Sequence, residues 1–335
     1  MNEEVKEMLD IIFSAHRTYV LMCADKLDII EHLYEIPMDS QQLALVTNTK
    51  PDLLRRFLRV LCSLKILEEN TNGQFTVTKL GTTLKSGTPN CLKNYFNLVN
   101  GFHPEPMMLL DHTLRTGEIA FDKIYKMPFF EYIRLDNEHS KTFDDAIKEQ
   151  DRAFKSDTFV SNYDYSGFNH IVDVGGGNGS FVLSILNKTP NARGTVFDVE
   201  GCMQLAKREI KRSGLESRCT AVAGNFFDSV PANGDCYILQ NILHDWEDSK
   251  ALKILANIRK IMKCDTKIII IEDMVRDNGE YGMSGMFDMI LMTYFGAKTR
   301  TKKEMEELCT KAMLKMHECL EFKDVGFIMM VFTLV

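Results

Sequence analysis

The sequence predicts an α/β protein in which a doubly wound, mostly parallel sheet follows a mainly helical N-terminal domain. From about residue 166 onward, short apolar strand patterns alternate with helix patterns, which is typical of a parallel sheet with helices on both faces. In the first part of the chain, helix patterns are followed by a hairpin pattern, which is the order of a winged helix. The length of 335 residues also suits two domains, at roughly 150 residues per domain.

The N-terminal domain, taken as residues 1–90, is expected to begin with two apolar helices. Apolar residues recur at helical spacing in the first of them, at Val5, Met8, Leu9 and Ile12. The second is predicted to run from about Ala15 to Tyr34. Ser40 is then expected to cap a short helix that continues through Val46, and Pro51 suits the first turn of the next helix because the missing N–H costs little there.

The helix after Pro51 and the hairpin complete this domain. Apolar residues line one face of the helix, at Leu54, Phe57, Leu58 and Leu61. Its basic residues fall largely off that face, and they leave two interpretations open: a DNA-recognition helix, or a side that faces solvent or a second subunit. The second is favoured. Strand patterns on both sides of the Asn72-Gly73 turn, between Glu68 and Lys79, predict the hairpin.

The remaining elements follow a helical connector, residues 91–165, which is interrupted at Pro104, Pro106, Gly117 and Pro128. Residues 166–335 form the predicted sheet domain. Its strands are expected at Ile171-Val172, 194–199, 219–223, 235–241 and 267–273, and its helices at 179–187, 201–213 and 247–263. Ligands of such sheets bind beyond the carboxyl ends of the strands, so residues at those ends are the candidates for function.

Composition excludes several classes of protein. Hydrophobic residues make up 45% and charged residues 26% of the chain, which excludes a mainly disordered or collagen-like protein. No apolar run approaches the roughly 18 residues of a membrane span. The nine cysteines are scattered without a Cys-x-x-Cys pair, so a reduced, cytoplasmic protein without a structural zinc is expected. The net charge of −7 argues against broad nucleic-acid binding.

A glycine loop with an acid before it and another beyond it is the strongest motif. Asp173 precedes three glycines, Gly175, Gly177 and Gly179, which open a helix, and the next strand ends at Asp198. A dinucleotide fingerprint would require glycine at Ser180, so the pattern is G-x-G-x-G instead. Because Asp198 can accept hydrogen bonds from ribose hydroxyls, the pattern suits a nucleoside without a pyrophosphate, and it favours S-adenosylmethionine over NAD.

Four ordered motifs resemble one family over nearly the whole chain. These motifs are VDVGGGNGS (172–180), TVFDV (195–199), GNFFDSVP (224–231) and ILHDWED (242–248). They are similar to those of the S-adenosylmethionine-dependent small-molecule O-methyltransferases, which include caffeate, isoflavone and acetylserotonin O-methyltransferases and bacterial natural-product enzymes. The resemblance implies a Rossmann-like methyltransferase sheet, an N-terminal winged-helix dimerisation domain, a homodimer, an aromatic acceptor and no metal.

The resemblance also implies roles for individual residues. His244 stands where the family has its general base, and Asp273 matches the acid that supports the base, with the adjacent Glu272 as the alternative alignment. A carboxylate that merely caps a strand is the other interpretation of Asp273. Phe226 is expected to stack on the adenine, and Asn225 to accept from its amino group.

Several departures from the family pattern leave a second function open. Asn225 stands where many relatives have Asp, and Gln240 stands near the methionine end of the cofactor, where many plant members carry Lys. Thr299 stands where plant enzymes place a second catalytic Glu. The alternative is therefore an enzyme that binds S-adenosylmethionine but catalyses a pericyclic, decarboxylation or hydroxylation step.

A methionine stripe lies on the helix predicted before Thr299, at Met283, Met286, Met289 and Met292. Such a stripe either packs in a core or lines the acceptor pocket, which the resemblance places at this helix. Met292 and Phe295 are the pocket candidates, together with Thr299.

Overall fold

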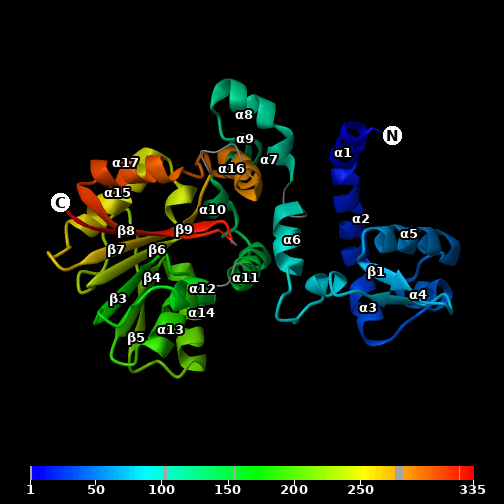
Figure 1. Ribbon diagram of the computed structural model, residues 1–335, viewed down its shortest axis with the longest axis horizontal. Helices are drawn as coiled ribbons and strands as arrows, with labels where there is room; N and C mark the ends of the chain where they lie inside the picture. The colour runs from blue at the N-terminus through cyan, green and yellow to red at the C-terminus, as the bar shows by residue number, and fades with distance from the viewer. Residues whose placement is uncertain (1, 101–103, 154–155, 276–281, 324) are drawn as a thin grey trace. The chain divides into compact units, whose positions relative to one another are not determined.

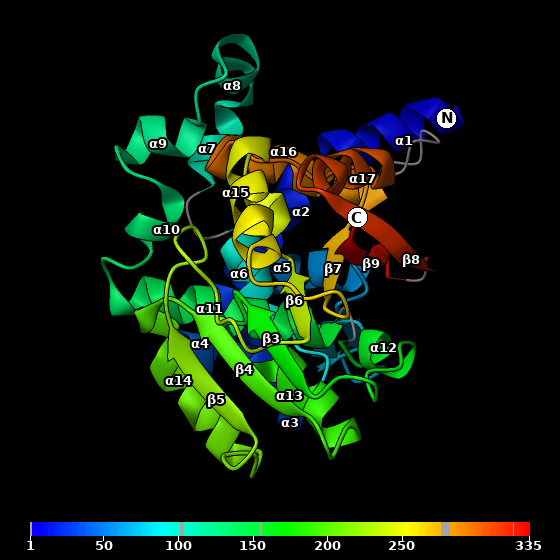
Figure 2. The ribbon, with the colours of Figure 1, turned by 90° about the vertical axis from the view of Figure 1, so that its left-hand side faces the viewer.

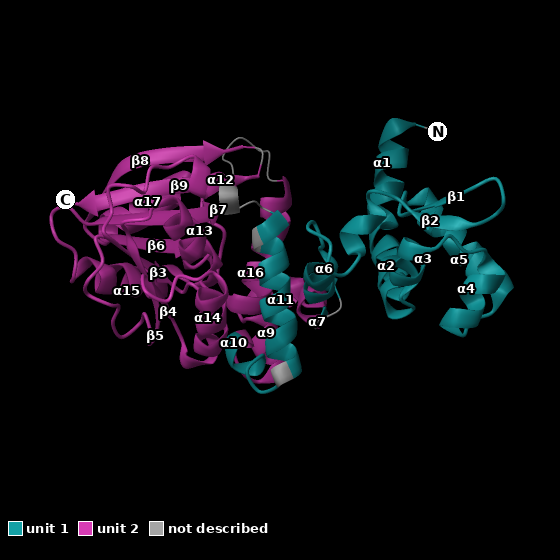
Figure 3. Cartoon of the chain, turned by 90° about the horizontal axis from the view of Figure 1, so that it is seen from below, with its two compact units in different colours: residues 1–104, 130–154 teal, residues 105–129, 155–335 magenta. Residues whose placement is uncertain are grey.

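The computed structural model describes residues 2–100, 104–153, 156–275, 282–323 and 325–335. The chain forms two compact units, each built from two stretches of sequence (Figure 3). Unit 1 contains Met1–Pro104 and Phe130–Phe154, and unit 2 contains Glu105–Phe129 and Lys155–Val335. The segment expected to form a connector, residues 91–165, is therefore divided between the two units.

Unit 1 begins with helices and a short antiparallel hairpin, in the order that the sequence predicts (Figure 1). Pro51 is the first residue of its helix, as expected. The elements are α1 (Glu3–Ile12), α2 (Ser14–Lys26), α3 (Ile29–Glu35), α4 (Ser40–Thr47), α5 (Pro51–Ser63), β1 (Leu67–Glu69), β2 (Phe75–Val77) and η1 (Gly81–Leu84). Two further helices complete the unit, α6 (Lys93–Asn100) and α11 (Asn137–Ala153).

Two expectations about these helices are wrong. The single helix expected from Ala15 to Tyr34 is broken between α2 and α3, where Asp28 has a φ of 50°. A residue in this left-handed region cannot continue a right-handed helix. The cap of α4 is Asp39 rather than Ser40: its Oδ1 accepts two N–H groups of the first helical turn at 2.8 Å each, and Ser40 lies inside the helix.

The core of unit 1 is made by the apolar faces of α3, α4 and α5 together with β2. Its most deeply buried side chains are Ile29, Leu33, Leu43, Leu58, Leu61 and Phe75. By contrast, α1 buries none of its residues. The apolar stripe that predicts α1 from the sequence is therefore exposed on this chain, at Val5, Met8, Leu9 and Ile12.

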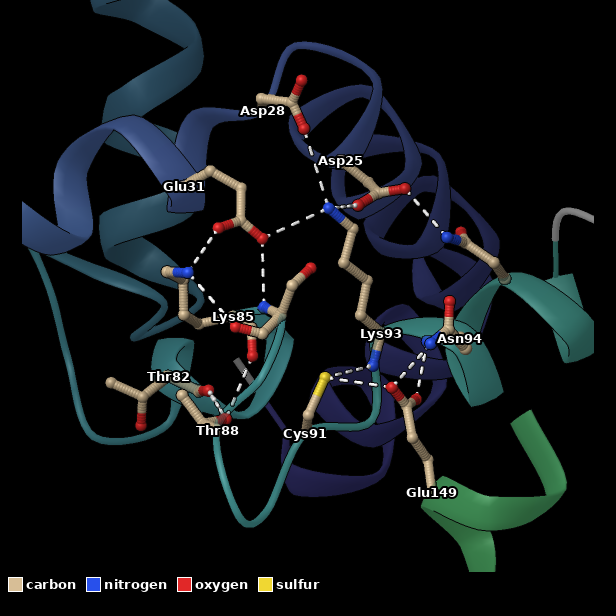
Figure 4. Close-up of polar contacts among 12 residues, drawn as sticks. Asp25, Asp28, Glu31, Thr82, Lys85, Thr88, Cys91, Lys93, Asn94 and Glu149 are labelled. Carbon is tan, nitrogen blue, oxygen red and sulfur yellow. Dashed lines mark hydrogen bonds and ion pairs between the residues drawn. The ribbon is translucent and has the colours of Figure 1, made fainter. Parts of the chain in front are cut away.

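Two charged side chains hold α6 in unit 1 (Figure 4). Lys93 Nζ lies between acidic residues of α2 and α3, 3.1 Å from Asp25 Oδ1 and 3.4 Å from Glu31 Oε1. Glu149 of α11 is buried, and its carboxylate accepts the backbone N–H of Asn94 at 2.6 Å. It also accepts the backbone N–H of Tyr95 at 3.0 Å. These N–H groups belong to the first turn of α6 and have no partner inside the helix, so Glu149 caps α6 from a segment distant in sequence.

Unit 2 contains a seven-stranded sheet in the order β5-β4-β3-β6-β7-β9-β8 (Figure 2). The first five strands are parallel, and β9 pairs antiparallel with both β7 and β8. The doubly wound, mostly parallel sheet is therefore confirmed, with two C-terminal strands that the sequence left unpredicted. The strands are β3 (His170–Val174), β4 (Arg193–Asp198), β5 (Cys219–Ala223), β6 (Cys236–Gln240), β7 (Lys267–Asp273), β8 (Leu314–Phe322) and β9 (Phe327–Leu334).

Helices lie on both faces of this sheet, with α15 and α17 on one face and α13 and α14 on the other (Figures 1 and 2). They enclose a core of fully buried strand residues such as Val172, Leu239, Ile268 and Ile270. The helices that follow β3 are α13 (Ser180–Lys188), α14 (Glu200–Arg212), η2 (Leu243–Asp245), α15 (Asp248–Arg259), α16 (Gly282–Phe295) and α17 (Lys302–Lys311). The earlier ones are α7 (Glu105–Met108), α8 (Leu110–Thr116), α9 (Ala120–Tyr125), α10 (Phe129–Tyr132), which begins at the boundary between the units, and α12 (Ser156–Ser161).

None of the helices in the described ranges combines the length and the apolar character that crossing a membrane requires.

Replacing Glu149 with Ala is expected to lower the free energy of unfolding of unit 1 by about 3 kcal/mol, because two partly buried N–H groups of the first turn of α6 lose a charged acceptor. Asp145→Ala, one turn earlier on α11, is the matched control. Its carboxylate pairs with Lys141 and Lys148, and such pairs near the surface contribute about 1 kcal/mol or less each. Urea unfolding followed by circular dichroism measures both. Equal losses in the two variants would contradict the capping role of Glu149.

Candidate active site

The glycine loop after β3 adopts a backbone that only glycine readily tolerates. Gly175, Gly177 and Gly179 have φ values of 76°, 55° and 80°. A Cβ atom at Gly175 would collide with Ile242, which follows β6, whereas a Cβ at Gly177 would meet no atom within 4 Å. The loop is therefore packed tightly against the chain after β6 on one side, and it is open at Gly177.

The two acids expected around the loop both lie against it. Asp198, at the end of β4, accepts the N–H of Gly177 at 2.8 Å through Oδ2 and that of Val199 at 2.6 Å through Oδ1. Asp173 is buried, and a Cβ atom at Gly176 would lie 2.7 Å from its carboxyl carbon. Asp198 thus holds the loop to the neighbouring strand, and Asp173 packs closely against Gly176.

Phe226 and Asn225 follow β5 and lie on the same side of the sheet. The ring of Phe226 packs edge-on against Trp246, with centroids 6.0 Å apart, and it lies beside Gly175. The side-chain oxygen of Asn225 accepts the N–H of Phe227 at 3.0 Å. An amide oxygen has two lone pairs, so this turn contact leaves Asn225 one acceptor position. Phe226 therefore lies at the glycine loop.

His244 lies in η2, just after β6, and it is nearly enclosed by protein. Its Nδ1 is 2.8 Å from Oε2 of Glu272, and its Nε2 is 3.5 Å from Oδ1 of Asp245. The ring of Phe287, on α16, packs edge-on against the imidazole with centroids 5.5 Å apart. The imidazole is therefore held between an acidic strand end and an aromatic helix residue.

Glu272 is the carboxylate that holds this part of the chain. It is 1% exposed, and its Oε1 accepts the backbone N–H groups of Ile242, Leu243 and His244 at 3.1, 2.8 and 3.3 Å. One oxygen of Glu272 therefore fixes the turn after β6, while the other faces the imidazole. A buried carboxylate with such partners is compensated for the loss of water.

Asp273, the acid singled out from the sequence, lies differently. Its Oδ1 accepts the hydroxyl hydrogen of Ser284 at 2.7 Å, and burial raises the pKa of its carboxyl group. Successive residues of a strand point to opposite faces, so Glu272 and Asp273 cannot both face the same group directly. The structure places Glu272, the alternative alignment, in contact with His244.

The acidic surroundings set the protonation of His244. Burial alone lowers the pKa of a histidine, but the negative charges of Glu272 and Asp245 outweigh it and raise the pKa of His244 to about 9. Burial in turn raises the pKa of Asp245 to about 6, against the opposing effect of the His244 charge. The acidic neighbours therefore favour the protonated imidazolium, and the ring becomes a better proton acceptor as the pH rises toward 9.

The expected acceptor-pocket residues lie on or just after α16. The N–H of Thr299 donates to Oδ1 of Asp288 at 2.7 Å, and the Thr299 side chain is buried. Phe295 packs edge-on against Phe129 with centroids 5.0 Å apart. A hollow of about 400 Å³ lies along α16, and it is lined by Val275, Gly282, Gly285, Met286, Asp288 and Met289. Met286 and Met289 of the stripe line this hollow, whereas Met292 and Phe295 do not.

Sequence reasoning missed two residues that touch the His244 loop, Phe287 and Arg300. Phe287 contacts the imidazole from α16, and the guanidinium of Arg300 binds backbone oxygens on both sides of His244. No nearby sequence pattern identifies either residue. Phe287 lies within an apolar helix pattern and Arg300 follows it, and the partners of both lie more than forty residues earlier in the chain.

Comparison with known proteins gives consistent matches over both units. The family model of the O-methyltransferase domain matches residues 108–314, and that of the O-methyltransferase dimerisation domain matches residues 9–87. A phenazine O-methyltransferase of Lysobacter antibioticus is 32% identical over 301 residues, which cover 90% of this chain and 88% of that protein. The resemblance indicated by the sequence motifs is therefore confirmed.

Two solved structures share the whole fold. The crystal structure of LaPhzM matches with a TM-score of 0.92 and 29% identity and covers 100% of both chains. That of NcsB1, an O-methyltransferase from neocarzinostatin biosynthesis in complex with S-adenosylmethionine and 2-hydroxy-5-methyl naphthoic acid, matches with a TM-score of 0.82 and 26% identity, and covers 95% of this chain and 96% of that one.

The imidazole of His244 is expected to titrate with a midpoint near 9, measured by NMR on protein with isotope-labelled histidine and assigned with His244→Ala. Glu272→Gln keeps an oxygen for the backbone N–H groups but removes the charge. It is expected to lower the midpoint by about one pH unit or more, whereas Asp273→Asn, the neighbouring control, lowers it less. A wild-type midpoint at or below the ordinary value of about 6.5 would refute the charge arrangement.

Proposed function

This chain belongs to the O-methyltransferases that use S-adenosylmethionine, and we propose that it methylates a hydroxyl group of a small aromatic molecule with His244 as the general base. The observation that supports the base assignment is the 2.8 Å approach of Glu272 to Nδ1 of His244, at the edge of the sheet where the glycine loop lies. The glycine loop after β3, Asp198 at the end of β4 and Phe226 after β5 are the groups that we assign to the nucleoside. The proposed base therefore lies next to the proposed cofactor site.

The residues present fit S-adenosylmethionine. The loop is open at Gly177, and Asp198 stands beside it at the end of β4, where a carboxylate can accept hydrogen bonds from ribose hydroxyls. Phe226 offers an aromatic face beside Gly175. We assign the cofactor to Asp173, Gly175, Gly177, Gly179, Asp198, Asn225, Phe226 and Gln240. When bound, the cofactor supplies the methyl group that the acceptor oxygen takes up.

His244 accepts the proton that the acceptor hydroxyl gives up. Once the imidazole is neutral, Glu272 at Nδ1 favours the tautomer that carries its proton there, which leaves the lone pair on Nε2 for the acceptor. After the transfer, Glu272 and Asp245 stabilise the imidazolium. The products are a methyl ether, S-adenosylhomocysteine and a protonated base, so the proton is accounted for. Asp273, which acts on His244 only through its charge, supports the base from the other face of β7.

An aromatic acceptor agrees with the residues on α16. Phe287 and the methionines that line the hollow present polarisable, flat-packing surfaces. The relatives point the same way, since one is named for a phenazine and another was solved with a naphthoic acid. Met292, Phe295 and Thr299 remain our further candidates for contact with the acceptor.

A reaction without methyl transfer, which Gln240 and Thr299 leave open in the sequence, gains no support from the site. The replacement of an acid by Thr299 removes one carboxylate from the family arrangement. His244 nevertheless keeps Glu272 at 2.8 Å and Asp245 at 3.5 Å, so the base is not left without acids.

A homodimer formed through unit 1 is part of the proposal. The O-methyltransferase dimerisation domain covers residues 9–87, and α1 exposes Val5, Met8 and Ile12 at about half of their full area. Apolar stripes of this kind on a soluble chain indicate an interface. We also propose a reduced, cytoplasmic setting, on the strength of the cysteine pattern.

His244→Ala is expected to lower the rate of methyl transfer by about 100-fold or more, the usual contribution of a general base. The assay follows labelled methyl from S-adenosylmethionine into a panel of phenols. His170→Ala is the matched control, because that histidine lies at the start of β3, away from the glycine loop, and its ring hydrogen-bonds the hydroxyl of Thr195. Calorimetry should show unchanged cofactor binding by His244→Ala.

Undiminished methylation by His244→Ala would remove His244 as the base. Cofactor binding by the wild type without methylation of any acceptor would instead favour a non-methylating reaction.

Ile12→Glu is expected to convert a dimer into a monomer, because a charge in the α1 stripe opposes its burial. Sedimentation equilibrium should give about twice the 38.4 kDa chain mass for the wild type. Leu45→Glu controls for added charge, since Leu45 is 84% exposed on α4. A wild-type monomer, or an Ile12→Glu variant that still dimerises, would contradict an interface at α1.

A further inference from the structure

Arg300 is a buried arginine whose side chain binds the turn that carries His244. It is 2% exposed. Its guanidinium donates to the carbonyl oxygen of Leu243 at 2.7 Å, to that of Trp246 at 2.8 Å, and to Oδ1 of Asp248 at 2.8 and 3.0 Å. Leu243 and Trp246 stand on either side of His244 in the sequence, so the arginine spans the base without touching its ring.

We infer that Arg300 is a positioning residue for His244. Glu272, at the end of β7, accepts the N–H groups of residues 242–244. Arg300, which precedes α17, donates to the carbonyl groups of residues 243 and 246. The backbone on both sides of the imidazole is thereby fixed by two charged side chains of opposite sign. This inference rests on the proposed role of His244 as the base.

The chemistry of the guanidinium group explains why an arginine stands here. Its planar fork places donors in fixed directions, so one side chain reaches two carbonyl oxygens and a carboxylate together. A lysine would keep the charge opposite Asp248 but would lack that fork. Asp248 begins α15, where a negative charge is favourable, so Arg300 also joins the His244 turn to the start of this helix.

Arg300 also connects the base to the helix proposed to line the acceptor pocket. It directly follows Thr299, whose N–H is held by Asp288 of α16, and Phe287 of the same helix contacts the imidazole. The segment from α16 to Arg300 therefore meets the His244 turn at two points: Phe287 contacts the imidazole, and Arg300 binds the carbonyl oxygens of Leu243 and Trp246. A shift of Arg300 changes the distance between base and acceptor, and misplacement of about 1 Å at a reacting group costs about 100-fold in rate.

Arg300→Lys tests this role in the full-length enzyme, with Arg300→Ala as the stronger variant. For Arg300→Lys, kcat for methyl transfer is expected to fall about 10-fold or more, while KM for S-adenosylmethionine stays within about twofold, because the glycine loop is untouched. Millimolar guanidinium, far below denaturing concentrations, is expected to restore part of the kcat of Arg300→Ala. Lys298→Ala is the matched control: Lys298 also approaches Asp248, at 3.4 Å, but binds neither carbonyl, and its kcat should stay within about twofold of the wild type.

The fluorescence of Trp246, the only tryptophan of the chain, provides a second readout that needs no turnover. Loss of the Arg300 contact to its carbonyl is expected to increase quenching of Trp246 by acrylamide, and guanidinium is expected to reverse the increase in Arg300→Ala. If His244→Ala methylates normally, the base assignment fails, but the fluorescence still tests whether Arg300 holds the turn.

Three results would overturn the inference. One is an Arg300→Lys variant with wild-type kcat and wild-type quenching. Another is a fall in kcat for Arg300→Lys that is accompanied by an equal loss of cofactor affinity, which would show general disruption. The last is a folded Arg300→Ala variant whose kcat and quenching do not respond to guanidinium. Should Arg300→Ala fail to fold, Arg300→Lys decides alone, since it keeps the buried charge opposite Asp248.

Discussion

The buried carboxylate of Glu272 is the contact on which the rest of the site depends. One of its oxygens takes three consecutive backbone N–H groups after β6, and the other stands 2.8 Å from the imidazole of His244. An ionised carboxylate loses much of its hydration when buried, and the backbone donors together with the histidine compensate for that loss. The same interaction therefore shapes the turn, orients the ring, and raises the pKa of His244 well above its ordinary value.

The sheet order explains why this turn meets a nucleoside site. From β3 the chain winds outward to β4 and β5 on one side, and it returns to β6 and β7 on the other. The crevice between β3 and β6 is the point where the winding reverses, and ligands of parallel sheets bind at such a point. The glycine loop follows β3 and His244 follows β6, so the cofactor loop and the proposed base adjoin as a consequence of topology. Arg300 and Phe287 then connect this edge to α16 and to the proposed acceptor pocket.

Much of the fold and part of the site could be predicted from local sequence patterns. The remaining features depend on contacts between segments that are distant in the sequence. The parallel strands are short apolar runs, and the glycine loop has its own spacing, so both are visible in the sequence. The strand β8 was not predicted because charged residues interrupt its apolar pattern, at Lys315, Glu318 and Glu321. The choice between Glu272 and Asp273 could not be made, since adjacent acids at a strand end differ only in the face they occupy. Arg300 was missed because its partners are brought to it by the packing of α15 and α17.

A crystal structure of the enzyme with S-adenosylhomocysteine and a methylatable phenol tests the central claim most directly. If His244 is the base that Glu272 orients, the phenol oxygen lies within hydrogen-bond distance of Nε2, at about 2.6 to 3.2 Å, and Nδ1 remains on Glu272. A phenol oxygen held by another group and out of reach of Nε2, or an imidazole turned so that Nε2 faces Glu272, would contradict the account.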